Sequence, residues 1–519
     1  MRPFIKINLL SLAGFLFSFL AFRATATTHY VAANGTNPVA PYLSWANAAT
    51  NIQDAINVST NGDLISVTNG VYRGGIAVTN AITIQSVNGL GTTLIDGNQA
   101  SICAALADGS TLSGFTLTNG YCTTAGAGVF CSSTNADVFN CLIISNSVYG
   151  GYGAVYYGTL SNCIITGNIS LYGDGVGAAF SVLNDCTLSG NIVPQRLNQG
   201  GGAGEGGGAL ECTLNRCVLA GNSAAWGGGA AASTLNNCLV TNNTSINYYS
   251  EGEALGGGLA FCYATNCTIV NNTVDYNFSY PASSSESGGV YGGTSVNCII
   301  YANRLYKIGF AYFLDNYDGS PTLNYCCTLP LPSGINNFTN APVFVNQSGG
   351  DYHLQSLSPC INAGNNASVT TTNDLDGNPR IVGGTVDVGA YEYQTPHSVI
   401  SYAWLQQYGL PTDGSVDFAD RDGTAFNIYQ DWIAGLNPTN PASVLVMLPP
   451  PATNNSSGIT VSWRSVSGIL YNLQRATGLS PQWSFSTIQS NIVGQAGTTS
   501  YTDTTATNNV AYFYRVGVP

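Results

Sequence analysis

Seven cysteines recur in one repeated string, and thiols at regular spacing are candidates for a metal site or a redox pair. An aliphatic residue stands two positions after each cysteine and an asparagine five positions after it, as in "CVLAGN" at Cys217. The cysteines are Cys141, Cys163, Cys186, Cys217, Cys238, Cys267 and Cys298. The asparagines are Asn146, Asn168, Asn191, Asn222, Asn243, Asn272 and Asn303.

The spacing of this string predicts a solenoid. Successive cysteines are 22, 23, 31, 21, 29 and 31 residues apart, and apolar and polar residues alternate between them. Five copies carry a glycine nine positions before the cysteine, namely Gly177, Gly208, Gly229, Gly258 and Gly289. A repeat of this length without a helical pattern is typical of one coil of a parallel β-helix.

Stacked coils explain the cysteines without a metal. Alternation along a strand places each cysteine and the aliphatic residue after it inside the solenoid. The thiols then form an apolar column, and the asparagine amides form a ladder that bonds from coil to coil. Cys212, five residues before Cys217, belongs to the same packing. Parallel side-chain vectors fit disulfide geometry poorly, so we expect packing in preference to a metal or redox site.

Composition limits the function classes. The chain has 519 residues, only 8% of them charged, and a net charge of -13. No basic patch is available for phosphates, so we expect no nucleic-acid partner. Residues 1 to 26 combine a basic start, an apolar run and Ala24-Thr25-Ala26, which predicts a cleaved signal peptide, with an uncleaved membrane anchor as the alternative. After cleavage no segment is apolar enough to cross a bilayer, and we expect a secreted or outer-surface protein.

Several segments resemble right-handed parallel β-helix proteins of the pectate-lyase-like superfamily. "GNSAAWGGGA" at residues 221 to 230 is similar to the repeats of polymorphic outer-membrane proteins, and "HYVAANGTNP" at residues 29 to 38 resembles the N-terminal cap. "SPCINAGNNASVTTTNDLDGNPRIVGGTVDVGAYEY" at residues 358 to 393 resembles the end of β-helix proteins with a choice-of-anchor module. The resemblance implies an all-β fold, a right-handed parallel β-helix over residues 27 to 395, in a bacterial surface protein.

The resemblance also raises the question of catalysis. Pectate lyases of this superfamily use calcium-binding acids and an Arg or Lys base, and polygalacturonases use clustered aspartates with a histidine. The three histidines lie outside the repeats, and no Asp-Asp pair occurs in the chain. Arg216 stands before Cys217, where other coils carry Asn or Asp, and a surface role is the simpler interpretation. Catalytic residues are therefore not predicted.

Residues 396 to 442 change character and predict a linker with helical spacing and clustered acids. The segment looks like a degenerate EF-hand-type calcium loop, in which Asp420, Asp422 and Asp431 fill positions 1, 3 and 12. Thr424 and Ala425 replace the usual acid and glycine at positions 5 and 6. We expect a solvated turn and no cofactor, with a weak calcium site as the alternative.

Residues 443 to 519 alternate between apolar and polar positions with turn-rich joins, which predicts a small β-sandwich with Trp463 buried. "AYFYRVGV" resembles the last strand of fibronectin type III domains. Such a module more often provides spacing or contact than catalysis.

Aromatic and acidic residues at equivalent positions predict a ligand surface. The long coils all expand at one point, so their insertions should leave one edge of the solenoid. Aromatic faces beside carboxylates suit sugar rings, whereas a tyrosine-rich solvated rim is the alternative. The candidate residues are Tyr172, Asp174, Glu205, Trp226, Tyr248, Tyr249, Glu253, Tyr276, Tyr280 and Glu286.

Two function classes follow from these features. The first is noncatalytic, adhesin-like binding of a polysaccharide, a cell-surface glycan or a partner surface. The second is a polysaccharide lyase or glycoside hydrolase that acts on acidic polysaccharides. The absence of a recognisable catalytic set favours the first.

Overall fold

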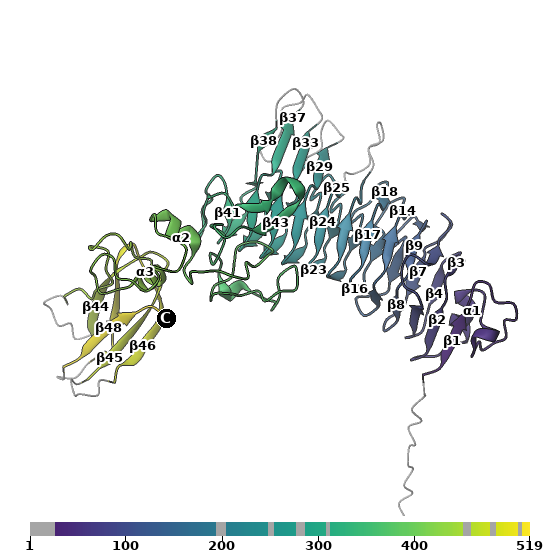
Figure 1. Ribbon diagram of the computed structural model, residues 1–519, viewed down its shortest axis with the longest axis horizontal. Coiled ribbons are helices and arrows are strands. Elements are labelled where there is room, and N and C mark those ends of the chain that lie inside the picture. The colour runs from purple at the N-terminus through teal and green to yellow at the C-terminus, as the bar shows by residue number, and fades with distance from the viewer. Residues whose placement is uncertain are drawn as a thin grey trace, which may run out of the picture.

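The computed structural model describes residues 26–193, 204–247, 254–276, 286–307, 312–449, 458–477, 484–506 and 511–519. Its main body is a right-handed parallel β-helix, along which short strands stack from the N-terminal α1 to β41 (Figure 1). The predicted fold class is therefore confirmed. The signal peptide predicted for residues 1 to 26 lies outside the described residues except for its last one.

Three long parallel sheets form the sides of the solenoid, and each coil between the first and the last gives one strand to each sheet. The twelve-stranded sheet consists of β1 (Thr28–Val31), β2 (Leu64–Val67), β5 (Thr83–Ser86), β8 (Thr111–Ser113), β12 (Asp137–Phe139), β16 (Thr159–Ser161), β20 (Val182–Asn184), β23 (Thr213–Asn215), β27 (Thr234–Asn236), β31 (Tyr263–Thr265), β35 (Thr294–Val296) and β40 (Thr322–Asn324). The eleven-stranded sheet consists of β3 (Gly70–Arg73), β6 (Thr93–Asp96), β9 (Thr116–Thr118), β13 (Leu142–Ile144), β17 (Ile164–Thr166), β21 (Thr187–Ser189), β24 (Val218–Ala220), β28 (Leu239–Thr241), β32 (Thr268–Val270), β36 (Ile299–Tyr301) and β41 (Cys327–Thr328). The ten-stranded sheet consists of β4 (Ile76–Val78), β7 (Ala104–Leu106), β11 (Val129–Cys131), β15 (Val155–Tyr156), β19 (Ala178–Ala179), β22 (Ala209–Leu210), β26 (Ala230–Ala231), β30 (Leu259–Ala260), β34 (Val290–Tyr291) and β39 (Tyr317–Asp318).

Two smaller sheets extend the coils beside the ladder asparagines. The first is parallel and consists of β10 (Tyr121–Cys122), β14 (Ser147–Val148) and β18 (Ile169–Ser170). The second consists of β25 (Ser223–Ala224), β29 (Thr244–Asn247), β33 (Thr273–Tyr276), β37 (Arg304–Lys307) and the antiparallel β38 (Phe313–Leu314).

The corner before each repeat cysteine explains the polar residue found there. This residue takes a left-handed conformation in every copy, with φ between 49° at Asn140 and 55° at Asn297. Asn and Asp tolerate that region better than other residues with a Cβ. Arg216 occupies the same corner at φ 50°. Its Nε and Nη2 donate to the two carboxylate oxygens of Asp185 on the preceding coil, each over 2.7 Å.

The N-terminal end of the solenoid is covered by helix α1 (Ile52–Val58), which buries Ile52, Ala55 and Ile56. The side chain of Asn51 caps this helix by accepting from the backbone N–H of Gln53. An amphipathic helix suits this place because it hides the open apolar end of the stack.

The segment from residue 344 to 393 covers the outside of the eleven-stranded sheet at its last coils. It contains the antiparallel hairpin of β42 (Phe344–Asn346) and β43 (Asp351–Leu354). Phe344, Tyr352 and Ile361 pack with outward residues of the sheet such as Val270 and Ile299. This segment therefore covers the apolar outer face of the eleven-stranded sheet. Parallel strands with apolar residues on both faces need such a cover to keep the outer face from water.

Two short helices and a small sandwich follow. Helix α2 (Tyr402–Gln407) and helix α3 (Ile428–Ala434) pack around Ile400, Leu405 and Ile428. The sandwich pairs β44 (Ile459–Ser465) with β47 (Gly497–Asp503), and β45 (Leu470–Ala476) lies between β46 (Ser486–Val493) and β48 (Phe513–Gly517). Trp463 is fully buried in its core, as expected from the sequence. The helices found in the described residues are all too short or too polar to span a bilayer.

Candidate functional site

The repeat cysteines lie in the interior of the β-helix and contact one another from coil to coil. All fifteen cysteines of the chain lie in described segments and are free thiols. The Cys217 thiol is buried and donates to the carbonyl of Leu183 over 3.5 Å, and the backbone N–H of Cys217 donates to the Cys238 sulfur over 3.4 Å. Burial raises the pKa of Cys217 well above its ordinary value, so the thiol stays protonated. These contacts place the cysteines among the packing residues of the interior.

The repeat asparagines form a continuous buried ladder. In each step the side-chain amide donates to the side-chain oxygen of the next asparagine, over 2.9 to 3.0 Å between Asn146 and Asn303. The same oxygen accepts the preceding asparagine's backbone N–H, as from Asn191 to Asn222 over 3.1 Å. The register glycines allow this close packing, since a Cβ on Gly208 would lie 2.5 Å from the Gly229 carbonyl oxygen. The ladder is fully used inside the fold, and it presents no group to a ligand.

The outside of the ten-stranded sheet carries a different kind of row, which we call the aromatic strip. Side chains in these strands alternate, so that Ala230 faces the interior while Ala231 faces outward. The outward positions of four successive strands hold small or aliphatic residues, and half-buried aromatic side chains pack over them. The covered residues are Ala179, Leu210, Ala231 and Ala260. The aromatic residues over them are Tyr152, Tyr156, Phe180 and Trp226.

Phe261 and Tyr291 extend the strip through ring contacts with Trp226 and Phe261, and its aromatic side chains gather in two groups. In the first, the Tyr152 and Tyr156 rings stack at 5.6 Å, and Phe180 meets Tyr152 edge-on at 4.9 Å. In the second, Phe261 lies 6.2 Å from Trp226 and 5.3 Å from Tyr291 between ring centroids. Phe261 is 47% exposed although it is a large apolar side chain, so the second group leaves part of an aromatic side chain open to solvent.

Three carboxylates, Asp174, Glu205 and Glu211, lie on the coils that carry the aromatic side chains. Asp174 pairs in register with Tyr152, and Glu205 pairs with Trp226. The Asp174 carboxylate also accepts the backbone N–H of Glu205 over 2.9 Å. Burial, followed by the charges of Asp174 and Glu211, raises the pKa of Glu205 above its ordinary value. The strip therefore combines ring faces with acceptors that favour hydroxyl or amine donors and oppose anions.

The structure unites part of the predicted ligand surface. Asp174, Glu205 and Trp226 lie in one row, and Tyr172 contacts Tyr149 nearby at 5.2 Å between ring centroids. Glu286 is only 3% exposed, so we leave it out of the accessible strip. Tyr276 is the last residue of β33. The other four candidates lie outside the described residues, namely Tyr248, Tyr249, Glu253 and Tyr280.

Sequence reasoning missed the residues of the strip that the neighbouring coils supply. Phe180, Glu211 and Phe261 take the left-handed conformation directly after their strands, with φ of 57°, 48° and 54°. Each stands six positions after the residue of its own coil in the row of Asp174, but unequal coil lengths hide this register in the sequence.

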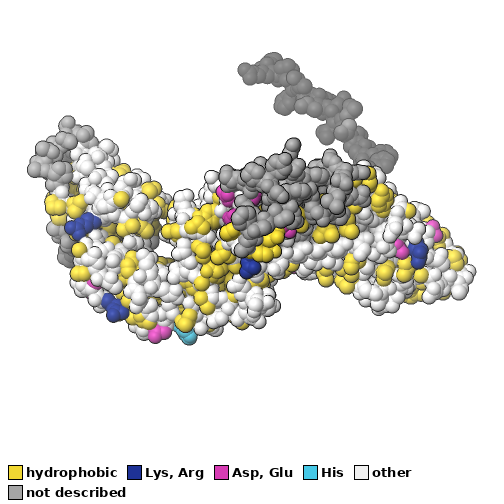
Figure 2. Space-filling model, turned by 90° about the horizontal axis from the view of Figure 1, so that it is seen from above, with side chains coloured by type: hydrophobic (Ala, Val, Ile, Leu, Met, Phe, Trp, Pro, Cys, Tyr) yellow, Lys and Arg dark blue, Asp and Glu magenta, His cyan; other side chains and the backbone are white. Residues whose placement is uncertain are grey.

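Figure 2 shows one face of the molecule, where hydrophobic side chains form a band along the β-helix and Lys and Arg stand singly.

Arg216 is held by the aspartate of the preceding coil. Its Nε and Nη2 both donate to Asp185, whose side chain raises the pKa of the guanidinium further. A fork-shaped pair of this kind holds Arg216 in its charged form and fixes its position on the surface. The interpretation as a surface residue agrees with this contact.

His353 forms a polar clasp with two aspartates on the segment that covers the eleven-stranded sheet. Its Nδ1 lies 2.6 Å from an oxygen of Asp351, and its Nε2 lies 2.6 Å from an oxygen of Asp376. Burial lowers the pKa of His353, but the bonds to Asp376 and Asp351 outweigh this effect and raise it overall. The ring also packs on Tyr391, 4.1 Å away between centroids. The clasp joins β43 to residues 374 to 393.

The buried arginine of "LDGNPR" holds the same segment together. Arg380 is 1% exposed, and its Nη2 donates to the carbonyls of Asp387 and Gly389 over 3.0 and 2.6 Å. The Glu392 carboxylate lies 3.8 Å from its Nη1 and accepts the backbone N–H groups of Val382 and Asp387. All these contacts are internal, which supports a structural role for the motif.

In the candidate calcium loop, backbone N–H groups already donate to the Asp420 carboxylate. Both oxygens of Asp420 accept backbone N–H groups, from Gly423 over 2.8 Å and from Ala425 over 3.0 Å. Ala425 takes φ 67°, the conformation for which glycine is the usual residue. Burial, together with the charges of Asp422 and Asp420, raises the pKa of Asp431 to about 6. Across the described residues, no group of three or more His, Cys, Asp or Glu side chains is arranged to hold a metal ion.

The sequence matches no family model and no curated protein. Among solved structures, the chain is similar to pectate lyase Pel9A, with 15% identity, a TM-score of 0.42, and coverage of 71% of this chain and 97% of that one. A rice weevil pectin methyl esterase shows 14% identity, a TM-score of 0.23, and coverage of 56% and 87%. A mutant of the PL6 family alginate lyase AlyGC shows 12% identity, a TM-score of 0.27, and coverage of 67% and 59%. The β-helix assignment itself rests on the long parallel sheets.

Proposed function

We propose that the chain is an exported surface protein whose aromatic strip binds an uncharged glycan without cleaving it. The observation that carries this proposal is the exposed ring of Phe261 beside Trp226, in rows that also hold Asp174 and Glu205. Sugar rings stack on aromatic faces, and their hydroxyl groups donate to carboxylates. The apolar run near the N-terminus supports export.

The charge of the strip supports an uncharged ligand over an acidic one. Burial raises the pKa of Glu205, and the nearby charges of Asp174 and Glu211 raise it further. A uronate polymer would add further negative charge at this place, which is unfavourable where the groups are partly buried. The whole chain carries a net charge of -13, so long-range steering also opposes an anionic polysaccharide.

The alternative is a hydrolase, and one observation favours it. The raised pKa of Glu205 beside Asp174 is a feature shared with the acid of a carboxylate pair in glycosidases. A lyase is less well supported, because the strip residues named above include no Lys, Arg or His that could act as a base. Release of reducing ends from neutral polysaccharides would favour the hydrolase, and unsaturated products would favour a lyase.

The test is an array of neutral, amino-containing and acidic polysaccharides probed with the full chain and two variants. Trp226→Ala combined with Phe261→Ala should weaken binding of neutral glycans about tenfold or more, since each ring contributes roughly 0.5–1.5 kcal/mol. Tyr263→Ala is the matched control, because Tyr263 is 63% exposed on the twelve-stranded sheet. Unchanged binding in the double variant, or an equal loss in the control, would contradict the proposal.

A further inference from the structure

A pocket lies where the last coil of the β-helix, the two linker helices and the sandwich approach one another. Its cavity volume is about 570 Å³, within the usual range of small-molecule sites. One wall comes from residues 325 to 340 of the β-helix, and another comes from α2 and α3. Ile469, directly before β45, closes the side toward the sandwich. The pocket shares no residue with the aromatic strip.

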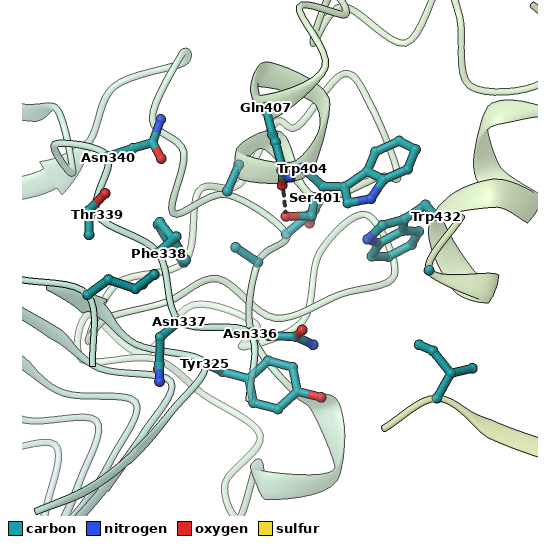
Figure 3. Close-up of a pocket in the computed structure, with 17 residues that line it drawn as sticks. Tyr325, Asn336, Asn337, Phe338, Thr339, Asn340, Ser401, Trp404, Gln407 and Trp432 are labelled. Atoms are coloured by element: carbon teal, nitrogen blue, oxygen red, sulfur yellow. Dashed lines mark hydrogen bonds between the residues drawn. The ribbon is translucent and has the colours of Figure 1, made fainter. Parts of the chain in front are cut away.

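The lining of the pocket is aromatic and uncharged. Four aromatic side chains contribute, namely Tyr325, Phe338, Trp404 and Trp432. Figure 3 shows the two indole rings on the same side of the pocket, with Tyr325 and Asn336 toward the β-helix wall. None of the seventeen lining residues is Asp, Glu, Lys, Arg or His, although the protein as a whole is strongly acidic. An ionic ligand would lose its hydration here without gaining a partner of opposite charge.

Amide side chains supply the polar contacts of the pocket. Asn336, Asn340 and Gln407 are exposed, and none of their side-chain amides bonds to another described residue. Asn337 differs, since its Oδ1 accepts the Cys326 N–H over 2.9 Å and its Nδ2 donates to the Leu323 carbonyl over 2.8 Å. Three amides therefore remain to donate to and accept from a ligand.

The walls that carry these groups are held in place. Tyr402 anchors α2 in the β-helix, because its ring is fully buried and its backbone N–H donates to the Ile361 carbonyl over 3.1 Å. Asn427 and Gln430 form a capping box at the start of α3. Trp404 and Trp432 pack partly on the small core around Leu405 and Ile428. A preformed site loses less conformational entropy on binding than a flexible one.

We propose that this junction pocket is a second binding site, which takes an uncharged saccharide unit. Aromatic faces with amide donors and acceptors, in the absence of charge, match a neutral sugar ring, which has an apolar face and hydroxyl edges. The site is independent of the strip, so it does not depend on the function proposed above. Two sites on one chain would raise the avidity for a polymeric glycan.

The experiment titrates the full chain with neutral hexasaccharides of β-1,4-linked glucose, mannose, galactose and xylose, and with hexagalacturonate as the charged control. Calorimetry is performed on the Trp226→Ala, Phe261→Ala background, so that the remaining heat reports on the junction pocket. Trp432→Ala should weaken binding of at least one neutral hexasaccharide about tenfold, whereas Trp404→Phe, which keeps a ring, should weaken it less. Trp45→Ala should change nothing, since Trp45 is 45% exposed at the N-terminal end.

Two further variants guard against loss of fold. Asn340→Ala and Gln407→Ala change exposed side chains, so the melting temperature should stay the same while neutral-sugar binding weakens. Absence of binding by every neutral hexasaccharide overturns the proposal. Binding that survives Trp432→Ala together with Asn340→Ala also overturns it, as does stronger binding of hexagalacturonate. If the Trp226→Ala, Phe261→Ala background by itself binds no neutral hexasaccharide, the strip is the only sugar site and the proposal fails.

Discussion

Replacing Asn222 with alanine tests how much the asparagine ladder contributes to the stability of the solenoid. The Asn222 Oδ1 accepts from the backbone N–H of Asn191 over 3.1 Å and from its side-chain amide over 2.9 Å. The Asn222 Nδ2 donates to the Leu188 carbonyl over 2.9 Å and to the Asn243 Oδ1 over 3.0 Å. Alanine removes all four bonds.

The loss of stability depends on which buried polar groups are left without a hydrogen-bond partner. The Asn191 side-chain amide still donates to the Ile165 carbonyl, and the Asn243 oxygen still accepts the residue 222 backbone N–H. The Asn191 backbone N–H and the Leu188 carbonyl lose the bonds named above. A buried group without its partner costs about 1–3 kcal/mol, so two such groups should lower the free energy of unfolding by roughly 2–6 kcal/mol. The unfolding entropy of residues 27 to 395 is roughly 0.8 kcal/mol/K, so the melting temperature should fall by about 3–8 °C.

The assay is far-UV circular dichroism during heating, with a matched asparagine as control. Asn215 also bonds to asparagines of adjacent coils, donating to Asn184 over 2.9 Å and accepting from Asn236 over 3.0 Å, but it is half-buried. Water can replace these bonds, so Asn215→Ala should cost about 1 kcal/mol or less. Equal shifts for Asn222→Ala and Asn215→Ala would refute the argument that burial of the ladder sets its contribution.

Three further outcomes are expected. Cys217→Ala should cost about 1–2 kcal/mol as a small core truncation, and native thiols should resist alkylation until the chain is unfolded without reductant, which mass spectrometry can follow. Calcium should bind the loop at Asp420 and Asp422 weakly, near millimolar or beyond, and tight calorimetric binding that Asp420→Ala abolishes would contradict this. The His353 clasp should stabilise the fold below its ordinary pKa of 6.5 and weaken as pH rises through the elevated folded pKa. Protonation of Asp351 should weaken the clasp again near its ordinary pKa of 3.8 or below. The stability difference between wild type and His353→Gln should therefore peak at about pH 5–6 in denaturant titrations, and a difference that grows above pH 8 would count against the clasp.

The sequence by itself determined the class of fold and the content of its interior. Cys217, Leu219 and Asn222 recur at fixed offsets in each coil, and parallel stacking in register turns any fixed offset into a column of like side chains. The conformation of one coil therefore predicts the conformation of its neighbours. In the sandwich, the burial of Trp463 follows from the alternation of apolar and polar residues within one strand.

Only the tertiary structure decided which surface residues meet. Coils of unequal length bring Phe261 beside both Trp226 and Tyr291, and the pairing depends on strand register across insertions that no local pattern encodes. The clasp between His353 and Asp376 joins segments that are not repeats of one another. The junction pocket needs Tyr325, Trp432 and Ile469, which come from three parts of the chain. Packing between such parts depends on their final orientation, and that orientation has no periodic signature in the sequence.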